Sequence, residues 1–292
     1  MADEPELLGL YWTISGPVVV HFGREWSLFS WAERCAEARE VGFAGLGLWH
    51  ADLEHVLETE TLADMKQALN DNGLARLELE FLMDWFFALG DERRQASDKT
   101  RDMLLEAASV LDAHHVKVGN IPGHQASLAQ LTERFGELCD IAAERTDAKI
   151  VYEFMPFDTN VRSLDSVLEV VGGAARPNGG IAIDTWHMSK LGIAPDDLRR
   201  IPLEYLSWIE LSDGRFADMD DPIDEVINHR NLPGEGEFDI RGYIAACQDH
   251  GYAGPWGVEV LSEELRNQPI DVIFRRAYDA TAAQFRPTGG SS

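Results

Sequence analysis

The segment AKIVYEFMPFDTNVRSLDSVLEVVGGAARPNGGIAID, residues 148–184, contains a complete strand–helix–strand repeat. The apolar runs at 148–153 and 180–184 have the length of buried strands, and SLDSVLEVVGG between them places its apolar residues at helical spacing. Ser163 can cap the start of that helix through its hydroxyl. Gly172 is expected to end the helix, because a helix commonly ends on a residue in the left-handed conformation. The segment therefore predicts a β-α-β unit, and each of its strands closes on an acid.

The same alternation of short apolar runs and helical stretches continues on both sides of this segment. It gives eight candidate strands, at residues 7–11, 44–48, 76–81, 116–118, 148–153, 180–184, 206–211 and 256–260. A helical stretch follows each strand, and the last one, at 263–285, reads as a single helix. Repeated β-α units form a parallel sheet, and about 250 residues are enough to close it into a barrel. We therefore expect an α/β protein with a single (β/α)8 TIM barrel over residues 1–286 and a flexible C-terminal tail at 287–292.

Composition and charge restrict the partners of this chain. Of its 292 residues, 45% are hydrophobic and 26% charged, as in ordinary globular proteins. A formal charge of −26, with no run of Lys or Arg to offset it, opposes binding to nucleic acid. No stretch approaches the roughly 18 apolar residues of a membrane span, and the N-terminus lacks a basic leader-like region. We expect a cytoplasmic protein with a small-molecule partner and no membrane association, and the sequence leaves open whether it forms a homo-oligomer.

Four acids stand at the ends of four different expected strands. They are Glu153 in KIVYE, Asp184 in GIAID, Glu210 in SWIELSD and Glu259 in GPWGVEV. The carboxyl ends of barrel strands converge on one mouth, so these side chains are expected to be neighbours. Their repulsion can be relieved by protonation, by Lys or Arg partners, or by a divalent cation, which prefers carboxylate oxygen. We expect a metal site made of all four, with Mn²⁺ or Mg²⁺ favoured over Zn, Co or Fe, because no Cys and few His accompany the acids.

Five motifs in the second half of the chain carry a family resemblance. In order they are VYEFMPF, IAIDTWHMSK, IELSDGR, NLPGEGEFD and GPWGVEV. Together they resemble the xylose isomerase-like sugar isomerase/epimerase superfamily, which includes hydroxypyruvate isomerases, ketose 3-epimerases, inosose dehydratases and 3-dehydroshikimate dehydratases. The resemblance is strong over residues 148–260 and looser before them.

The resemblance implies roles for several of these residues. Glu153, Asp184 and Glu259 match metal-binding acids of the family, and Glu153 and Glu259 match the pair that moves the proton in similar epimerases. His187 follows Asp184 as the family's DxxH motif places it, and it is expected to touch substrate or a ligand carboxylate; a buried structural histidine is the alternative. Glu210 departs from the family, whose members usually have His or Gln at this position, so its ligation is an open question.

Five further residues are candidates for the site. Lys117 in HVKVG is expected to offer a cation to a substrate oxygen or to act as a general acid, or else to pair with a barrel acid. Arg215 and Arg230 flank the loop after the seventh strand, and the resemblance implies that both can bind substrate carboxylate or hydroxyl oxygens through their guanidinium groups. His50 follows the second strand and is expected to reach substrate from the mouth, and Trp85 is expected to do so because aromatic walls stack on the apolar faces of sugar rings. A structural or surface role is the alternative for each.

The longest stretch expected to be irregular, at about 212–239, is acidic and punctuated by Gly and Pro, and we expect it to form a lid or pocket wall. Taken together, the chain is expected to be a metal-dependent isomerase or epimerase of a keto-sugar, polyol ketone or hydroxy-ketone, acting through an enediolate. The alternative is lyase chemistry on a cyclic keto-polyol or 3-keto-glycoside, C-glycosides included. A non-catalytic binding barrel is a third hypothesis. The DNA-repair branch of the superfamily is disfavoured, because Asn228 and Arg230 replace its DxH ligand pair.

Overall fold

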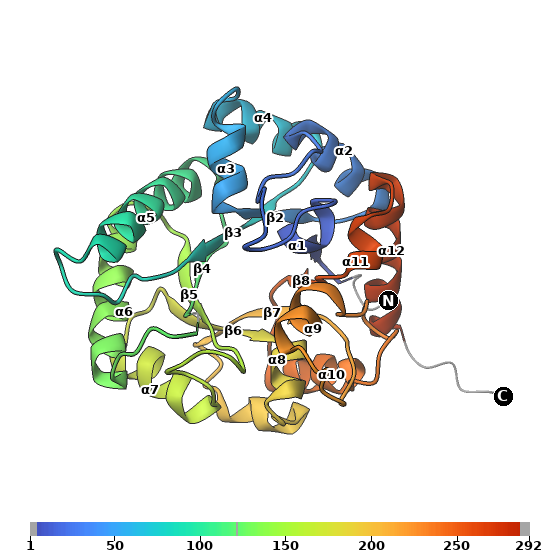
Figure 1. Cartoon of the computed structure of the whole chain (residues 1–292). Coiled ribbons are helices and arrows are strands. Elements are labelled where there is room, and N and C mark those ends of the chain that lie inside the picture. Colours follow the sequence, from blue (N-terminus) through green and yellow to red (C-terminus); the bar gives the residue numbers. More distant parts are fainter. Residues whose placement is uncertain (1–4, 121, 287–292) are drawn as a thin grey trace.

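Eight parallel strands close into one barrel, in the order in which they occur along the chain (Figure 1). The computed structural model describes residues 5–120 and 122–286, so the tail expected at 287–292 lies outside the described residues. The strands are β1 (Leu7–Gly9), β2 (Gly45–Trp49), β3 (Arg76–Leu82), β4 (His115–Val118), β5 (Lys149–Glu153), β6 (Gly179–Asp184), β7 (Leu206–Leu211) and β8 (Trp256–Val258). Pairing of β1 with β8 completes the ring. The predicted TIM barrel is confirmed, with every expected strand found in its place.

Helices surround this barrel on the outside (Figure 1). The longer ones are α2 (Trp31–Val41), α4 (Leu62–Asp71), α5 (Glu92–Leu111), α6 (Leu128–Ala143), α7 (Leu164–Ala174), α10 (Ile240–His250) and α12 (Ile270–Ala282). Short ones lie at strand ends or in loops: α1 (Tyr11–Ile14), α3 (His50–Val56), α8 (Thr185–Lys190), α9 (Pro222–Asn228), α11 (Glu263–Arg266), and the 3-10 helices η1 (Pro195–Arg200) and η2 (Ala283–Phe285). After β6 the outer layer is thin, since only α8 and η1 follow it.

Three local predictions need correction. Gly172 lies inside α7, and Ala175 takes the left-handed conformation at its end, with φ of 51°. The expected helix at 263–285 is broken, because Pro269 precedes α12 in an extended conformation and has no N–H group to continue a helix. The long stretch at 212–239 is partly helical, since it contains α9.

The barrel interior holds a small apolar cluster at its centre. Its members are Leu8, Leu10, Val151, Ala182 and Trp208, all fully buried. Trp208 fits there because Gly257 on the neighbouring β8 has no side chain; a Cβ at Gly257 would lie 2.8 Å from the Trp208 ring. This cluster forms the floor on which polar side chains from the strand ends rest.

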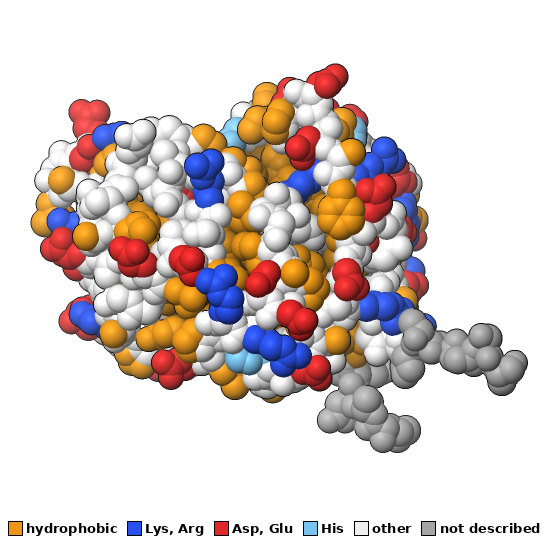
Figure 2. Space-filling model, turned by 90° about the horizontal axis from the view of Figure 1, so that it is seen from below, with side chains coloured by type: hydrophobic (Ala, Val, Ile, Leu, Met, Phe, Trp, Pro, Cys, Tyr) orange, Lys and Arg blue, Asp and Glu red, His pale blue; other side chains and the backbone are white. Residues whose placement is uncertain are grey.

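Acidic side chains are dispersed on the face of the molecule seen in Figure 2. On the face shown in Figure 2, Asp and Glu side chains are interspersed with Lys, Arg and apolar side chains, and no broad basic patch gathers. Within the described part of the chain, no helix has the length and apolar character needed to cross a membrane.

Candidate active site

The four predicted acids come together at the mouth of the barrel. Glu153 and Asp184 end β5 and β6, Glu210 lies one residue before the end of β7, and Glu259 directly follows β8. Register pairs Asp184 with Glu210 across neighbouring strands. All four side chains are buried, and each offers an oxygen within 4.8 Å of the others. The convergence of strand ends has produced the cluster that the sequence predicted.

Lys117 on β4 lies inside this cluster. Its Nζ is 2.7 Å from Glu210 Oε1, 2.9 Å from Glu259 Oε1 and 3.6 Å from Glu153 Oε2. The ammonium group is fully buried, and the surrounding carboxylates raise its pKa well above the ordinary value despite that burial. Lys117 therefore pairs with barrel acids, as one reading of the sequence allowed. It does not line the pocket described below, so a direct contact with substrate is not supported.

Two further acids, Glu78 and Glu80 on β3, were missed from the sequence. Glu80 Oε2 lies 3.0 Å and Glu78 Oε1 3.2 Å from Lys117 Nζ, and both side chains are buried. The signal was present in LELEFL, because residues two apart on a strand point to the same side. Leu77 and Leu79 join the apolar core, which leaves the two glutamates facing the barrel interior.

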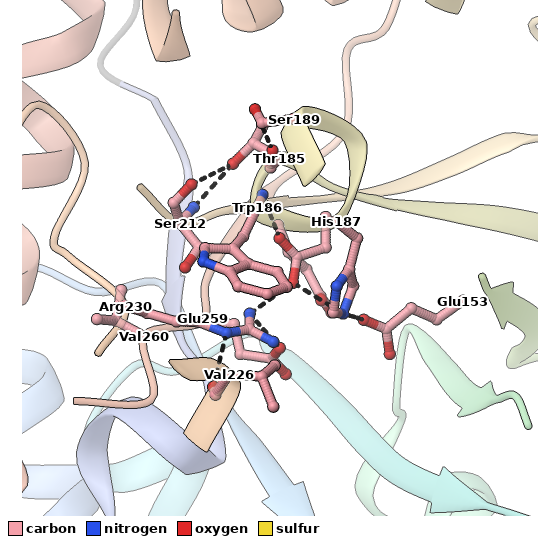
Figure 3. A network of polar contacts seen from close by, with 12 residues as sticks. Glu153, Thr185, Trp186, His187, Ser189, Ser212, Val226, Arg230, Glu259 and Val260 are labelled. Atoms are coloured by element: carbon pink, nitrogen blue, oxygen red, sulfur yellow. Dashed lines mark hydrogen bonds and ion pairs between the residues drawn. The ribbon is translucent and has the colours of Figure 1, made fainter. Parts of the chain in front are cut away.

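Arg230 and His187 complete the polar network at the mouth. Arg230 follows α9, and its Nη1 donates to Asp184 Oδ2 at 2.7 Å and lies 3.4 Å from Glu259 Oε2. His187 on α8 places its Nε2 3.3 Å from Glu153 Oε1 and 3.4 Å from Asp184 Oδ2. Figure 3 shows His187, Arg230 and Glu259 converging from different elements. Arg230, which was predicted to bind substrate, therefore also contacts two of the clustered acids.

The loop that carries Arg230 is held by one carboxylate. Asp213, after β7, accepts hydrogen bonds from the backbone N–H groups of Gly214, Gly234, Gly236 and Phe238 at 2.7–3.0 Å. A Cβ at Gly236 would lie 2.3 Å from Asp213 Oδ1, so only glycine fits there. The SDG and PGEGEFD motifs therefore meet in space and fix the path of the chain beside the mouth.

Within the described barrel, buried carboxylates outnumber buried cations. Glu78, Glu80, Glu153, Asp184, Glu210 and Glu259 face only Lys117 and Arg230. This excess of carboxylates affects their pKa values. Burial raises the pKa of Glu80 and of Glu210 well above the usual range, although Lys117 opposes the shift.

Glu153 behaves in the opposite way. Burial alone would raise its pKa, but Lys117 and His187 outweigh burial and hold the pKa at about 2. Glu153 is therefore ionised at neutral pH, beside Glu80 and Glu210, whose pKa values are shifted in the opposite direction. Environments that push the pKa values of neighbouring carboxyls apart provide a base and an acid in one site.

The donor set fits a hard divalent cation. Its oxygens are close enough to share one ion, and Glu210 Oε2 is buried with no hydrogen-bond partner among the described residues. Glu153, Asp184 and His187 form an overlapping set of possible ligands. Lys117 and Arg230 do not balance all the carboxylates of the cluster. A bound cation would compensate the remaining negative charge.

A pocket of about 240 Å³ opens above the cluster. Glu80, Glu153, His187, Arg230 and Glu259 reach it from the polar side. His21 also lines the pocket, and the rest of its lining is apolar or aromatic: Trp12, Val20, Trp49, Phe81, Met83, Pro122, Met155, Phe157, Ile223, Val226, Ile227 and Leu261. The pocket thus presents a charged floor and an apolar wall to one ligand.

Three predicted substrate residues lie outside this lining. Trp85 is buried and donates through Nε1 to the Gly119 carbonyl, so it belongs to the core between barrel and helices. His50 accepts a long hydrogen bond from the Phe81 N–H, at 3.5 Å, behind the pocket wall. Arg215 is exposed and lines a separate cavity on the other side of α9. A position near a strand end was therefore not enough to place these three side chains in the lining of the pocket.

Comparisons with known proteins agree with this geometry. A family model described as xylose isomerase-like TIM barrel matches residues 35–280. The chain belongs to the xylose isomerase-like TIM barrel family. The predicted superfamily is confirmed, and the curated relatives of the chain are isomerases and dehydratases.

Two curated relatives illustrate the range of this family. The 3-dehydroshikimate dehydratase of Pseudomonas aeruginosa is 26% identical over 244 residues, covering 81% of this chain and 37% of the relative. The inosose isomerase of Halalkalibacterium halodurans is 23% identical over 236 residues, covering 78% of this chain and 82% of the relative. The chain spans little more than a third of the dehydratase.

Solved structures of xylose isomerase-like barrels share the fold. An IolI protein with a bound zinc atom superposes with a TM-score of 0.81 at 18% identity, covering 96% of this chain and 97% of that one. D-allulose 3-epimerase from Methylomonas sp., solved with D-allulose, superposes with a TM-score of 0.72 at 18% identity, covering 97% of this chain and 98% of that one. These similarities concern the architecture of the barrel.

Proposed function

We propose that this chain is a divalent-metal-dependent isomerase or epimerase of a keto-sugar, polyol ketone or related hydroxy-ketone. The observation that carries the proposal is the cluster of Glu153, Asp184, Glu210 and Glu259, buried and mutually close at the floor of the pocket. Enolisation of a hydroxy-ketone needs a positioned base and stabilisation of the negative charge that develops on oxygen. This site contains groups for both tasks.

The protein side chains divide the work as follows. Glu153, with a pKa of about 2, is ionised and lines the pocket, so it is the proposed base that takes the proton next to the carbonyl. Glu259 also lines the pocket, and burial raises its pKa, so it is the proposed partner that returns a proton to the other face. His187 and Arg230 hold these carboxylates in position and reach the substrate oxygens.

A metal would be held by Glu153, Asp184 and Glu259, with Glu210 as the proposed fourth ligand. When bound, it supplies charge that stabilises an enediolate. We propose Mn²⁺ or Mg²⁺ because the donors are carboxylate oxygens. The zinc bound by the IolI protein shows that a related barrel accepts a different divalent ion.

The pocket wall indicates the kind of substrate. Indole and phenyl rings stack on the apolar faces of rings, and Trp12, Trp49 and Phe157 provide such surfaces. A volume of about 240 Å³ suits one compact ring better than a long chain. We therefore propose a cyclic or partly apolar hydroxy-ketone.

Hydrogen–deuterium exchange tests this function. In D₂O with added Mn²⁺, the protein is expected to exchange the proton next to the carbonyl of inosose or D-allulose, as followed by NMR. Glu153→Gln is expected to slow exchange by about 10²- to 10⁴-fold, because the base is lost. Glu106→Gln, at an exposed position on α5, is the matched control and should leave the rate unchanged. Equal rates for Glu153→Gln and wild type would contradict the proposed role of Glu153.

Lyase chemistry in the same pocket is the second candidate. It shares the first proton abstraction and then expels a group from the next carbon. The observation that favours it is a further carboxyl group in the pocket, that of Glu80, beyond the pair needed for epimerisation.

A further inference from the structure

The carboxyl group of Glu210 is held at one of its two oxygens. Its Oε1 accepts a hydrogen bond from the indole Nε1–H of Trp208 at 2.8 Å and another from Lys117 Nζ at 2.7 Å. Its Oε2 is buried and has no hydrogen-bond partner among the described residues. Two donors therefore fix the orientation of this carboxyl, and the second oxygen is left to accept a further partner.

The position of the Trp208 indole is set by packing inside the barrel. Trp208 and Glu210 lie two residues apart on β7, so their side chains point to the same side of the strand. The indole is fully buried above Gly257, and the ring of His115 packs against it with centroids 4.5 Å apart. Its N–H is therefore directed at Glu210 by the core itself.

Glu210 differs in this respect from two other acids of the cluster. Glu153 and Glu259 line the pocket, where a substrate can contact them, whereas Glu210 does not belong to the lining formed by the described residues. The direction of its carboxyl therefore depends on protein donors behind it. Of these, Lys117 brings a positive charge that partly neutralises the acid, and the indole of Trp208 brings none. An indole N–H can only donate, so it orients the carboxylate and leaves its charge available to a cation.

We propose that Trp208 is a positioning residue of the metal site, and that its indole N–H holds Glu210 Oε1 so that Oε2 is presented to the cation. The inference rests on the proposed function, since the metal site is part of it. It also specifies how Glu210 binds, through one oxygen, while the other stays with Trp208 and Lys117. Hydrogen bonds behind a metal ligand fix its orientation, and their loss commonly weakens metal binding by about 10- to 100-fold.

Two changes at position 208 remove the donor. Trp208→Phe keeps an aromatic ring in the core but has no N–H group. A tryptophan analogue with sulfur in place of the indole N–H keeps the full size of the ring, so it decides the question if the phenylalanine variant does not fold. Trp31→Phe is the matched control, because Trp31 on α2 is also fully buried and donates through Nε1 to the Met65 carbonyl, at 3.1 Å.

Isothermal titration of the full chain with Mn²⁺ measures the effect on binding. For both changes at position 208 we expect the dissociation constant to rise by about 10- to 100-fold, and for Trp31→Phe we expect it to stay within about twofold of wild type. In a Glu210→Ala background, Trp208→Phe should cause no further loss, because the ligand that Trp208 orients is gone. The electron paramagnetic resonance spectrum of Mn²⁺ at saturation should also change in Trp208→Phe, since one ligand is no longer fixed.

Three results would overturn the proposal. The first is Mn²⁺ affinity within about twofold of wild type when the donor at position 208 is removed. The second is an equal loss of affinity from Trp208→Phe with and without Glu210, which would show that the tryptophan acts on the site by general packing. The third is an equal loss in Trp31→Phe. Wild-type protein that binds no Mn²⁺ would instead refute the metal site of the proposed function, on which this inference rests.

Discussion

Lys117 shows how one residue can organise the centre of the site. Its ammonium lies 2.7–3.6 Å from carboxylate oxygens of acids on β3, β5 and β7 and of Glu259, which follows β8. A buried charge is costly by itself, and so is a buried carboxylate that has lost its partner. Removal of either the lysine or its partner acids is therefore expected to destabilise the folded protein, because the remaining buried charges lose their partners.

Replacement of Lys117 tests this dependence. Lys117→Met keeps the apolar stem but removes the charge, and it is expected to lower the free energy of unfolding by about 3–5 kcal/mol. Adding Glu210→Gln to this variant should recover part of the loss, because one uncompensated carboxylate is then removed. Urea unfolding of the two variants and wild type measures both effects. A Lys117→Met protein as stable as wild type would show that the cluster does not need the ammonium.

The sequence revealed some of these residues and hid others for a physical reason. Glu153, Asp184, Glu210 and Glu259 were found because strand ends in a barrel share one mouth. Glu78 and Glu80 were visible only as alternation within β3, where both faces are buried and alternation alone does not say which face is interior.

At the scale of elements, strands were predicted more accurately than side-chain directions in loops. Each short apolar run became a strand because both faces of a barrel strand are buried. His50, Trp85 and Arg215 lie just beyond strand ends, where the direction of a side chain depends on how the loop folds back. That information is tertiary, and no local pattern contains it.

The loop between β7 and α10 depends on Asp213. Asp213→Ala leaves four backbone N–H groups without their acceptor, and it is expected to lower the free energy of unfolding by about 2–4 kcal/mol. Asp213→Asn, which keeps one acceptor oxygen, should lose less. Limited proteolysis is expected to cut near the PGEG turn in Asp213→Ala first. Asp220→Ala, at an exposed position in the same loop, is the control, and equal stability of the two alanine variants would refute the role of Asp213.

At the scale of the whole molecule, the barrel carries titratable groups from the mouth to its opposite end. His115 Nε2 lies 3.6 Å from Glu78, and His114 Nδ1 lies 2.9 Å from His115 Nδ1. Burial, and then His115, lower the pKa of His114 to about 3. The unfolded chain, with an ordinary histidine pKa of 6.5, therefore binds a proton more readily than the folded protein below that pH.

This difference predicts an acid-dependent loss of stability. The contribution of neutral His114 is complete above pH 6.5 and is lost as the pH falls toward 3. Relative to His114→Asn, wild type is expected to lose about 1.4 kcal/mol of unfolding free energy per pH unit in this window. Urea unfolding of both proteins at several pH values measures the difference. Parallel stability curves from pH 7 to pH 4 would contradict the lowered pKa.

The central claim is that the carboxylates at the barrel mouth form a divalent-metal site. Anomalous diffraction from crystals of the full chain grown with Mn²⁺ tests it most directly. We predict one strong peak bounded by Glu153, Asp184 and Glu259, with Glu210 as the fourth ligand and Arg230 moved away from Asp184. The contrary result is the absence of a peak at the mouth, with Lys117 and Arg230 still bridging the carboxylates, and it would show that this barrel uses its own cations where a metal was proposed.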